Sequence, residues 1–112
     1  MRESIFCTIA VLAVSGCGGS DSTGPAATTS VRVRDNSFSP GAITVSPQAT
    51  VTWTWNGSDT HNVTFEDAQG SSGTQVSGTH NRSFATTGTF RYRCTVHSES
   101  FTSGMIGSVL VQ

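Results

Sequence analysis

The chain has 112 residues and a formal net charge of -1, which suits one small domain and leaves no room for a second core of useful size. Charged residues make up only 12 % of the chain and its arginines do not cluster, so neither nucleic acid nor an acidic membrane surface is indicated as a partner. Abundant Gly, Ser and Thr between short alternating apolar runs favour an all-β fold over a helical one.

The N-terminal residues have the pattern of a secretion signal. Residues 5–14 form an apolar stretch of signal-peptide length that is too short to span a bilayer as a stable helix. The run Val14-Ser15-Gly16-Cys17 follows and resembles a bacterial lipobox, in which Cys17 is lipidated and becomes the first residue of the mature protein. Cleavage without lipidation is the alternative. We therefore predict a lipoprotein signal peptide over residues 1–16 and an extracytoplasmic, membrane-anchored protein on the periplasmic or cell-surface side.

Residues 17–29 have the composition of a tether. After Cys17 they contain Gly, Ser, Thr, Asp, Pro and Ala and no large apolar side chain, so they cannot bury enough apolar surface to fold. A flexible coil of a dozen residues has a root-mean-square span of roughly 20 Å. We therefore expect a lipidated cysteine and a flexible linker over residues 17–29, followed by one folded domain over residues 30–112.

The folded domain has the pattern of short β-strands separated by turns. Alternating apolar and polar residues predict one solvated and one buried face for each strand, and Gly, Pro, Asn and Asp mark turns at residues 38–41 and 56–59. Residues 66–79 are polar and glycine-rich and predict a loop. The pattern predicts a Greek-key antiparallel β-sandwich with strands at residues 31–34, 42–45, 50–55, 61–65, 82–84, 89–94 and 107–112.

Four side chains that bind soft metal ions are predicted to meet at one end of this sandwich. His61 begins one inward-facing strand and Cys94 ends another, so strand alternation points both into the same end of the core. His97 lies three residues after Cys94, close enough in a tight turn to reach the same ion. Met105 shares parity with the inward positions of the last strand. One thiolate, two imidazoles and a weak thioether are the ligand set of blue-copper electron-transfer sites.

Cys94 is predicted to be the free thiol of the mature protein. Signal cleavage removes Cys7 and lipidation occupies Cys17, whereas cysteines outside the cytoplasm are normally paired. A bound metal accounts for an unpaired thiol there, and the alternative is an inert cysteine buried in the core. The histidines and the methionine nearby favour the metal.

The same residues carry a resemblance to a known family. The runs 51–65, which includes His61-Asn62, and 88–107, which includes Cys94-Thr95-Val96-His97 and Gly104-Met105-Ile106-Gly107, resemble the plastocyanin branch of the cupredoxins. The resemblance covers essentially all of residues 30–112. It implies one type 1 copper ion with His61, Cys94 and His97 as strong ligands and Met105 as the long axial ligand. It also implies that the backbone N–H of Asn62 reaches the Cys94 sulfur and tunes the site.

The predicted ligand loop departs from the family pattern in one respect. The family commonly shows C-x-x-H-x-x-x-x-M, with four residues between the second histidine and the methionine. Here seven residues, 98–104, separate His97 from Met105. The path of these residues therefore decides whether Met105 reaches the metal.

The leading functional hypothesis is a membrane-tethered type 1 copper protein that carries one electron between a redox protein donor and a redox protein acceptor. The resemblance implies that His97 is the more exposed ligand and that the electron leaves near Phe101. We expect a monomer that binds no nucleic acid. We also expect that the protein is not an enzyme, because the sequence has one ligand cluster and neither a phosphate loop nor a hydrolase triad. The alternatives are a copper-trafficking lipoprotein without an electron-transfer role, a zinc site and a metal-free immunoglobulin-like domain.

Overall fold

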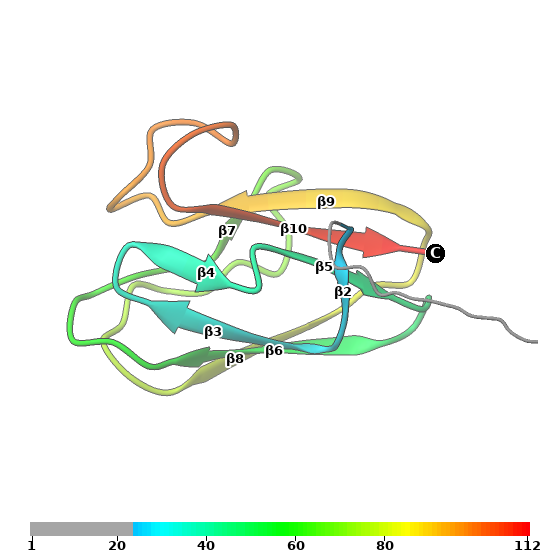
Figure 1. Ribbon diagram of the computed structural model, residues 1–112, viewed down its shortest axis with the longest axis horizontal. Helices are drawn as coiled ribbons and strands as arrows, with labels where there is room; N and C mark the ends of the chain where they lie inside the picture. Colours follow the sequence, from blue (N-terminus) through cyan, green and yellow to red (C-terminus); the bar gives the residue numbers. More distant parts are fainter. Residues whose placement is uncertain (1–23) are drawn as a thin grey trace, which may run out of the picture.

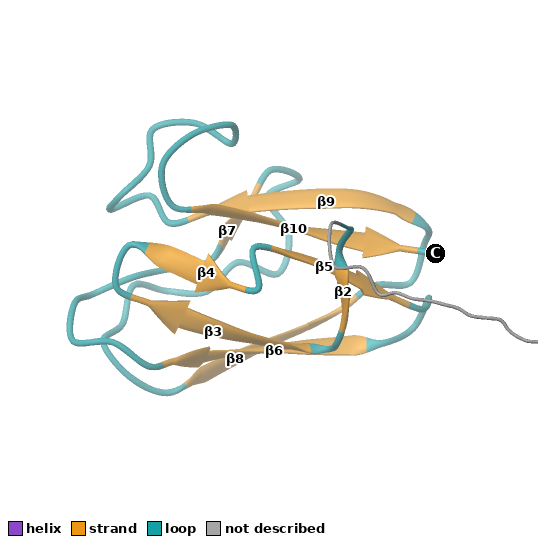
Figure 2. Cartoon of the chain, in the orientation of Figure 1, coloured by secondary structure: helices purple, strands orange, loops and turns teal. Residues whose placement is uncertain are grey.

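The computed structural model describes residues 24–112, and in these residues the chain forms nine strands in two sheets that pack face to face (Figures 1 and 2). The predicted signal peptide and Cys17 lie outside the described residues. Within residues 24–112 there is no helix long and apolar enough to cross a membrane. The strands are β2 Ala26–Ala27, β3 Ser30–Arg34, β4 Ser37–Ser39, β5 Ala42–Val45, β6 Thr50–Trp55, β7 Thr64–Phe65, β8 Thr79–Ser83, β9 Gly88–Arg93 and β10 Ile106–Val111.

Alternation of side chains along each strand builds the core between the two sheets. One sheet has the strand order β2-β5-β10-β9-β7 and the other β4-β3-β6-β8. In β6, Val51, Trp53 and Trp55 are buried while the threonines between them are not, as the period of two requires. Burial in β3 and β10 alternates in the same way. The predicted all-β sandwich is therefore confirmed.

The pairing of strands is mixed rather than antiparallel throughout. β10 pairs with β9 antiparallel but with β5 parallel, and β3 pairs with β6 parallel. The apolar pattern of a strand specifies which face it buries, but it carries no information on the direction of the neighbouring strand. The sequence therefore predicted the layers correctly and the strand directions only in part.

Several predicted boundaries differ from the structure. The strand predicted over residues 82–84 is β8, which begins earlier, inside the predicted loop 66–79, and covers Thr79–Ser83. Ser37–Ser39 form the strand β4, which pairs with β3, although residues 38–41 were expected to be a turn, and the side chain of Phe38 is buried as an anchor. Ala26–Ala27 pair in parallel with Ile43 and Thr44 of β5, so two residues within the predicted linker 17–29 belong to the sheet. Two alanines can join a sheet through backbone hydrogen bonds without the apolar pattern that marks a strand in the sequence.

Segment 61–65 is extended, but only Thr64–Phe65 pair with another strand, β9. The backbone N–H groups of Val63 and Phe65 donate instead to the hydroxyls of Ser72 and Ser71, at 2.8 and 3.0 Å. The polar loop that follows β7 therefore supplies by side chains the hydrogen bonds that a neighbouring strand would supply. This is why the predicted strand over residues 61–65 is shorter in the structure.

Aromatic rings pack edge to face in the middle of the sandwich. The ring of Trp53 lies 5.5 Å from Phe65 and 5.4 Å from Tyr92, and Phe38 lies 4.7 Å from Tyr92, each pair in a T-shaped arrangement. Such pairs stabilise the fold by more than the burial of their apolar surface alone. They form a stiff support beneath the loops at one end of the molecule, where the β3–β4 turn, the β6–β7 connection and the β9–β10 connection lie together, away from the C-terminus (Figure 1).

Candidate metal centre

Three predicted ligands converge at the end of the sandwich where these loops meet. One ligand atom from each of His61, Cys94 and His97 lies within 4.8 Å of the others. The sulfur of Cys94 is 3.8 Å from Nδ1 of His61 and 3.6 Å from Nδ1 of His97, and the two Nδ1 atoms are 3.2 Å apart. His61 and Cys94 have no exposed surface, and His97 is half-buried. The sulfur and both Nδ1 atoms therefore face one common point.

Hydrogen bonds of the main chain hold His61 on the body of the domain. The N–H of His61 donates to the carbonyl of Gln75, and the N–H of Gln75 donates back to the carbonyl of His61, both at 2.9 Å. The indole N–H of Trp55 donates to the same His61 carbonyl at 3.1 Å. The position of His61 is thus determined by the core strand β6 and by the loop that follows β7.

The pairing of β9 with β10 continues one step beyond the strands and brings Met105 beside Cys94. Ile106 is the partner of Arg93 in the ladder, and the N–H of Cys94 donates to the carbonyl of Met105 at 3.0 Å. The N–H of Met105 donates to the carbonyl of His97 at 3.4 Å. The side chain of Met105 is only 2 % exposed. Met105 therefore lies inward at the base of the loop, in agreement with its parity.

The three additional residues of the ligand loop are accommodated in a lobe, residues 98–104, that projects from the molecule between β9 and β10 (Figure 1). The hydroxyl oxygen of Ser98 lies 2.5 and 2.6 Å from the carbonyl oxygens of Ser100 and Ser103, which share its single donor hydrogen. Arg93 donates to the Ser98 carbonyl, and its guanidinium lies 5.2 Å from the ring of Phe101. Gly104 closes the lobe with a φ of 86°. The longer loop therefore leaves the register between Cys94 and Met105 intact.

The distal nitrogen of His61 has a carboxylate partner that sequence reasoning missed. Nε2 of His61 lies 3.0 Å from Oδ1 of Asp35, in the turn between β3 and β4. When the proton is on Nε2, Nδ1 is unprotonated and its lone pair is directed toward Cys94. The hydrogen bond from His61, followed by those from the backbone N–H groups of Asp59 and Ser58, holds the pKa of Asp35 well below its usual range. In the sequence Asp35 appears only as the residue that ends a strand, and 26 positions separate it from His61.

Asn62 ties the two sides of the centre together through its side chain. Its amide nitrogen donates to the hydroxyls of Thr95 and Thr74, at 2.8 and 3.0 Å, and its amide oxygen accepts the backbone N–H of Thr95 at 3.0 Å. These bonds connect the residue after His61 to the residue after Cys94. The hydrogen bonds described for the Cys94 sulfur run to the two imidazoles, and the contact expected from the Asn62 backbone N–H stays a prediction.

The donor set and its burial fit a copper ion. Cys94 is a free, buried cysteine, and a thiolate beside two imidazoles is a combination that copper accepts readily. The thioether of Met105 adds a second soft sulfur donor to this set. His61 and Cys94 are closed to bulk water, so a metal ion bound there would exchange its hydration shell for protein ligands. The residues present therefore fit the group that the sequence indicates.

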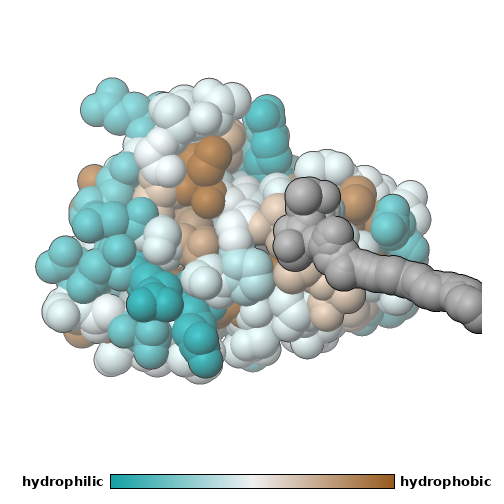
Figure 3. All heavy atoms as spheres, viewed as in Figure 1, coloured by the Kyte–Doolittle hydropathy of each residue, from teal (hydrophilic) through white to brown (hydrophobic). Residues whose placement is uncertain are grey.

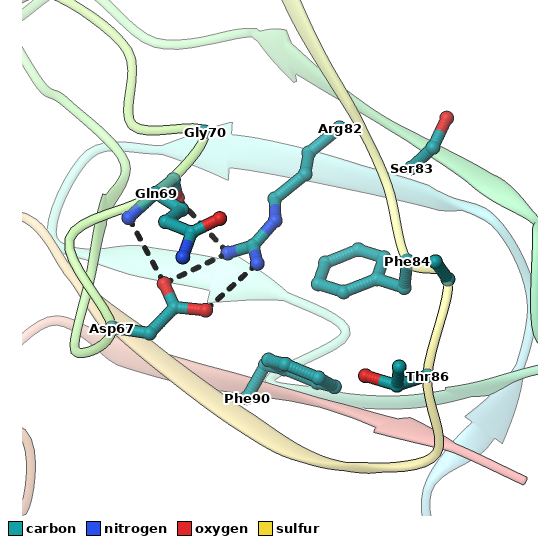
Figure 4. A pocket seen from close by; sticks show the side chains of 9 residues that line it. Asp67, Gln69, Gly70, Arg82, Ser83, Phe84, Thr86 and Phe90 are labelled. Atoms are coloured by element: carbon teal, nitrogen blue, oxygen red, sulfur yellow. Dashed lines mark hydrogen bonds and ion pairs between the residues drawn. The ribbon is translucent and has the colours of Figure 1, made fainter.

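A cleft away from this centre has a structural explanation. It is lined by residues of β8, β9, the connection between them and the loop after β7, among them Asp67, Arg82, Phe84 and Phe90 (Figure 4). The guanidinium of Arg82 lies over Phe65 and Phe84, 4.4 and 4.6 Å from their ring centroids, and pairs with Asp67 at 2.8 Å. Arg82 is thus fully engaged in holding the loop against the sandwich.

A small β-sandwich with one thiol and two imidazoles converging at one end defines a mononuclear metal-binding domain of the blue-copper type. The sequence model described as copper binding proteins, plastocyanin/azurin family, matches residues 26–112. The chain therefore belongs to this family. Its cofactor is one type 1 copper ion, for which His61, Cys94 and His97 are suitably arranged. Members of the family are in general extracytoplasmic electron carriers.

Solved structures show the same fold. A purple cupredoxin from Nitrosopumilus maritimus is 22 % identical with a TM-score of 0.61, and the match covers 74 % of this chain and 98 % of that one. Plastocyanin from Dryopteris crassirhizoma is 24 % identical with a TM-score of 0.60, over 74 % and 99 % of the two chains. A copper-containing nitrite reductase from Thermus scotoductus is 20 % identical with a TM-score of 0.62, over 85 % of this chain but only 24 % of that one. A search of curated proteins finds no match.

Proposed function

We propose that this protein is a one-electron carrier whose copper ion is bound by His61, Cys94 and His97, with Met105 as a weak axial ligand. The observation that carries the proposal is the convergence of the three donor atoms within 4.8 Å of one another at a largely buried point. The placement of Met105 opposite Cys94 in the β9–β10 register supports the axial role.

The copper ion supplies the one-electron chemistry by alternating between Cu(II) and Cu(I). The protein contributes a fixed environment for both states. The hydrogen bonds of His61 with Gln75 and the Asn62–Thr95 bonds restrain the two sides of the site. The aromatic rings beneath it resist displacement because close-packed interiors deform little. A site that changes shape little loses little energy to rearrangement when its charge changes.

His97 is the proposed ligand nearest to solvent. It is half-buried, whereas His61 and Cys94 have no exposed surface. Val96, the residue before it, has 49 % of its surface exposed, and the face shown in Figure 3 has a small hydrophobic area beneath the projecting loop. We place the contact with redox partner proteins at this end, where an electron has the shortest route between a partner and the site.

The membrane anchor is a proposal from the sequence. Cys17 would carry the lipid after removal of residues 1–16, and the domain would lie on the periplasmic or cell-surface side. The position of β2 is compatible with this arrangement, since Ala26–Ala27 pair with β5 beside the C-terminal half of β10, whereas the metal centre lies beyond the N-terminal end of β10. Replacing Cys17 with Ala should move the protein from the membrane fraction to the soluble fraction, and unchanged fractionation would refute lipidation.

The electron-carrier proposal is tested by the spectrum and the redox behaviour of the copper-loaded protein. We expect an intense visible thiolate-to-copper band and a reversible one-electron couple in the wild type. Cys94→Ser should abolish the band, whereas His80→Ala, which removes a histidine bonded to the Gly70 carbonyl, should retain it. A colourless, redox-silent copper complex would overturn the proposal.

Copper trafficking remains the alternative use of such a site. Trafficking requires exchangeable ligands, whereas two of the three proposed ligands are fully buried, which favours a carrier. Copper that leaves within seconds to a mild chelator would favour trafficking, and retention over hours would favour the carrier.

A further inference from the structure

The Asp35 carboxylate occupies a built position behind His61. Oδ1 accepts the hydrogen of His61 Nε2 at 3.0 Å, and the backbone N–H groups of Ser58 and Asp59 donate to the same carboxylate at 3.0 to 3.1 Å. The carboxylate therefore bridges the β3–β4 turn, the β6–β7 connection and the imidazole. Three independent donors fix the orientation of one side chain.

Gly57 leaves the space that this arrangement needs. A Cβ atom at position 57 would overlap the Asp35 carboxylate, so the close approach of the two turns requires glycine. The turn 56–59 is thereby shaped around Asp35 rather than only around its own backbone. The side chain of Asp35 is 36 % exposed while that of His61 is fully buried, so the carboxylate is the point at which the buried imidazole is connected to the surface.

We propose that Asp35 is a positioning residue for the copper centre, which fixes the tautomer and orientation of His61 and lowers the reduction potential of the bound copper. The inference rests on the proposed role of His61 as a ligand. A carboxylate that accepts the distal N–H of a ligating imidazole orients the ring and raises its donor strength. It also places a negative charge near the metal, which stabilises Cu(II) more than Cu(I).

The first experiment compares the reduction potentials of copper-loaded wild type, Asp35→Asn and Asp59→Asn by protein voltammetry. Asp35→Asn removes the charge behind His61, whereas Asp59→Asn removes an equal charge from the adjoining turn 56–59, whose backbone N–H groups bond to Asp35. We expect Asp35→Asn to weaken Cu(II) binding relative to Cu(I) about tenfold, at the lower end of the effect of such partners. For a one-electron couple this raises the potential by about 59 mV. Asp59→Asn should change the ratio of Cu(II) affinity to Cu(I) affinity less than about twofold.

A second variant keeps the negative charge and moves it. Gly57→Ala should displace the carboxylate from His61 and shift the potential in the same direction as Asp35→Asn. Equal shifts of the reduction potential in Asp35→Asn and Asp59→Asn would show a general charge effect and overturn the proposal. An unchanged potential in both Asp35→Asn and Gly57→Ala would also overturn it.

A third measurement does not depend on copper and separates this inference from the electron-carrier proposal. Nitrogen NMR of the metal-free full chain should show the His61 proton on Nε2 in the wild type and a mixed tautomer in Asp35→Ala. A proton on Nδ1 in the wild type would overturn the role of Asp35, even where copper binds as proposed. A wild type with this tautomer but no thiolate-to-copper band would refute the copper site and leave the Asp35–His61 pair intact.

Discussion

The two sides of the metal centre are built in different ways. On the His61 side, the imidazole belongs to a segment bonded to Trp55, Gln75 and Asp35, three positions in separate parts of the domain. On the loop side, residues 94–105, Cys94 is buried at the end of a strand, but His97 is half-buried and is followed by a lobe whose hydrogen bonds are largely internal.

This difference separates two tasks. The His61 side is rigid because disturbing it requires breaking contacts with the core, whereas the loop side can change without unfolding the sandwich. A copper site needs a fixed geometry on one side and an accessible ligand on the other if it is to meet partner proteins. The two sides should therefore respond differently to the same kind of change.

Removing each imidazole should give the largest contrast. His97→Gly and His61→Gly should both lose the thiolate-to-copper band of the wild type. Added imidazole should restore it in His97→Gly, because the cavity left by a half-buried side chain opens to solvent, and should not restore it in His61→Gly, whose cavity is closed. Titration with imidazole monitored by visible absorption measures this, and equal rescue of both variants would contradict the contrast.

Changing the residue that closes the lobe should disturb the loop side most. Gly104 has a φ of 86°, and a Cβ there would lie 2.8 Å from the carbonyl oxygen of His97. Gly104→Val should therefore lower the free energy of unfolding by about 2–3 kcal/mol and alter the visible spectrum. Gly73→Val is the matched control, since a Cβ at position 73 meets nothing within 4 Å. Chemical denaturation of the two variants measures the difference.

The same substitution of serine on each side should give unequal effects. The Ser72 hydroxyl accepts the backbone N–H of buried Val63 at 2.8 Å, so Ser72→Ala leaves a buried donor unpaired and should cost about 1–3 kcal/mol. Ser98→Ala removes the central hydrogen bonds of the lobe, whose carbonyls can turn to water, and should cost about 0.5–1 kcal/mol. Urea denaturation measures both values, and a larger loss for Ser98→Ala would reverse the assignment of the rigid side.

The ion pair of Asp67 and Arg82 lies outside both sides of the metal centre, and its removal should have the smallest effect on stability. The hydrogen bond from Arg82 holds the pKa of Asp67 below the ordinary value of an aspartate carboxyl. The stabilisation is therefore present above that value and is lost as the pH falls through the lower pKa of the folded state. Asp67→Asn should cost under about 1 kcal/mol at pH 7, and the difference from the wild type should shrink below pH 4. Thermal unfolding measured from pH 7 to pH 2 tests this, with the copper spectrum at pH 7 unchanged.

Local sequence patterns contain most of the information on the positions of the proposed metal ligands. Alternation along two strands points His61 and Cys94 to the same end of the core, and this parity depends only on the period of two. The inward position of Met105 follows from the same rule, because the lobe ends in a strand whose register with β9 is retained. These positions could therefore be predicted before any contact was known.

The remaining features depend on contacts between distant segments. The parallel pairing of β5 with β10 and the addition of Ala26–Ala27 to the sheet arise from backbone bonds that any side chain permits. Asp35 reaches His61 only because two turns meet at one end of the sandwich, with Gly57 between them. No periodicity within the chain marks such a meeting, which is why Asp35 was expected to do no more than end a strand.

The closure of the lobe has a practical consequence for protein engineering. The backbone bonds from Cys94 to Met105 and from Met105 to His97 close the loop at its base, so segment 98–104 lies outside the part of the chain that sets the register between Cys94 and Met105. A foreign peptide inserted within residues 99–102 would be displayed beside the proposed copper site, with the backbone bonds at the base of the loop retained. Such an insertion could attach the protein to an electrode surface in a defined orientation.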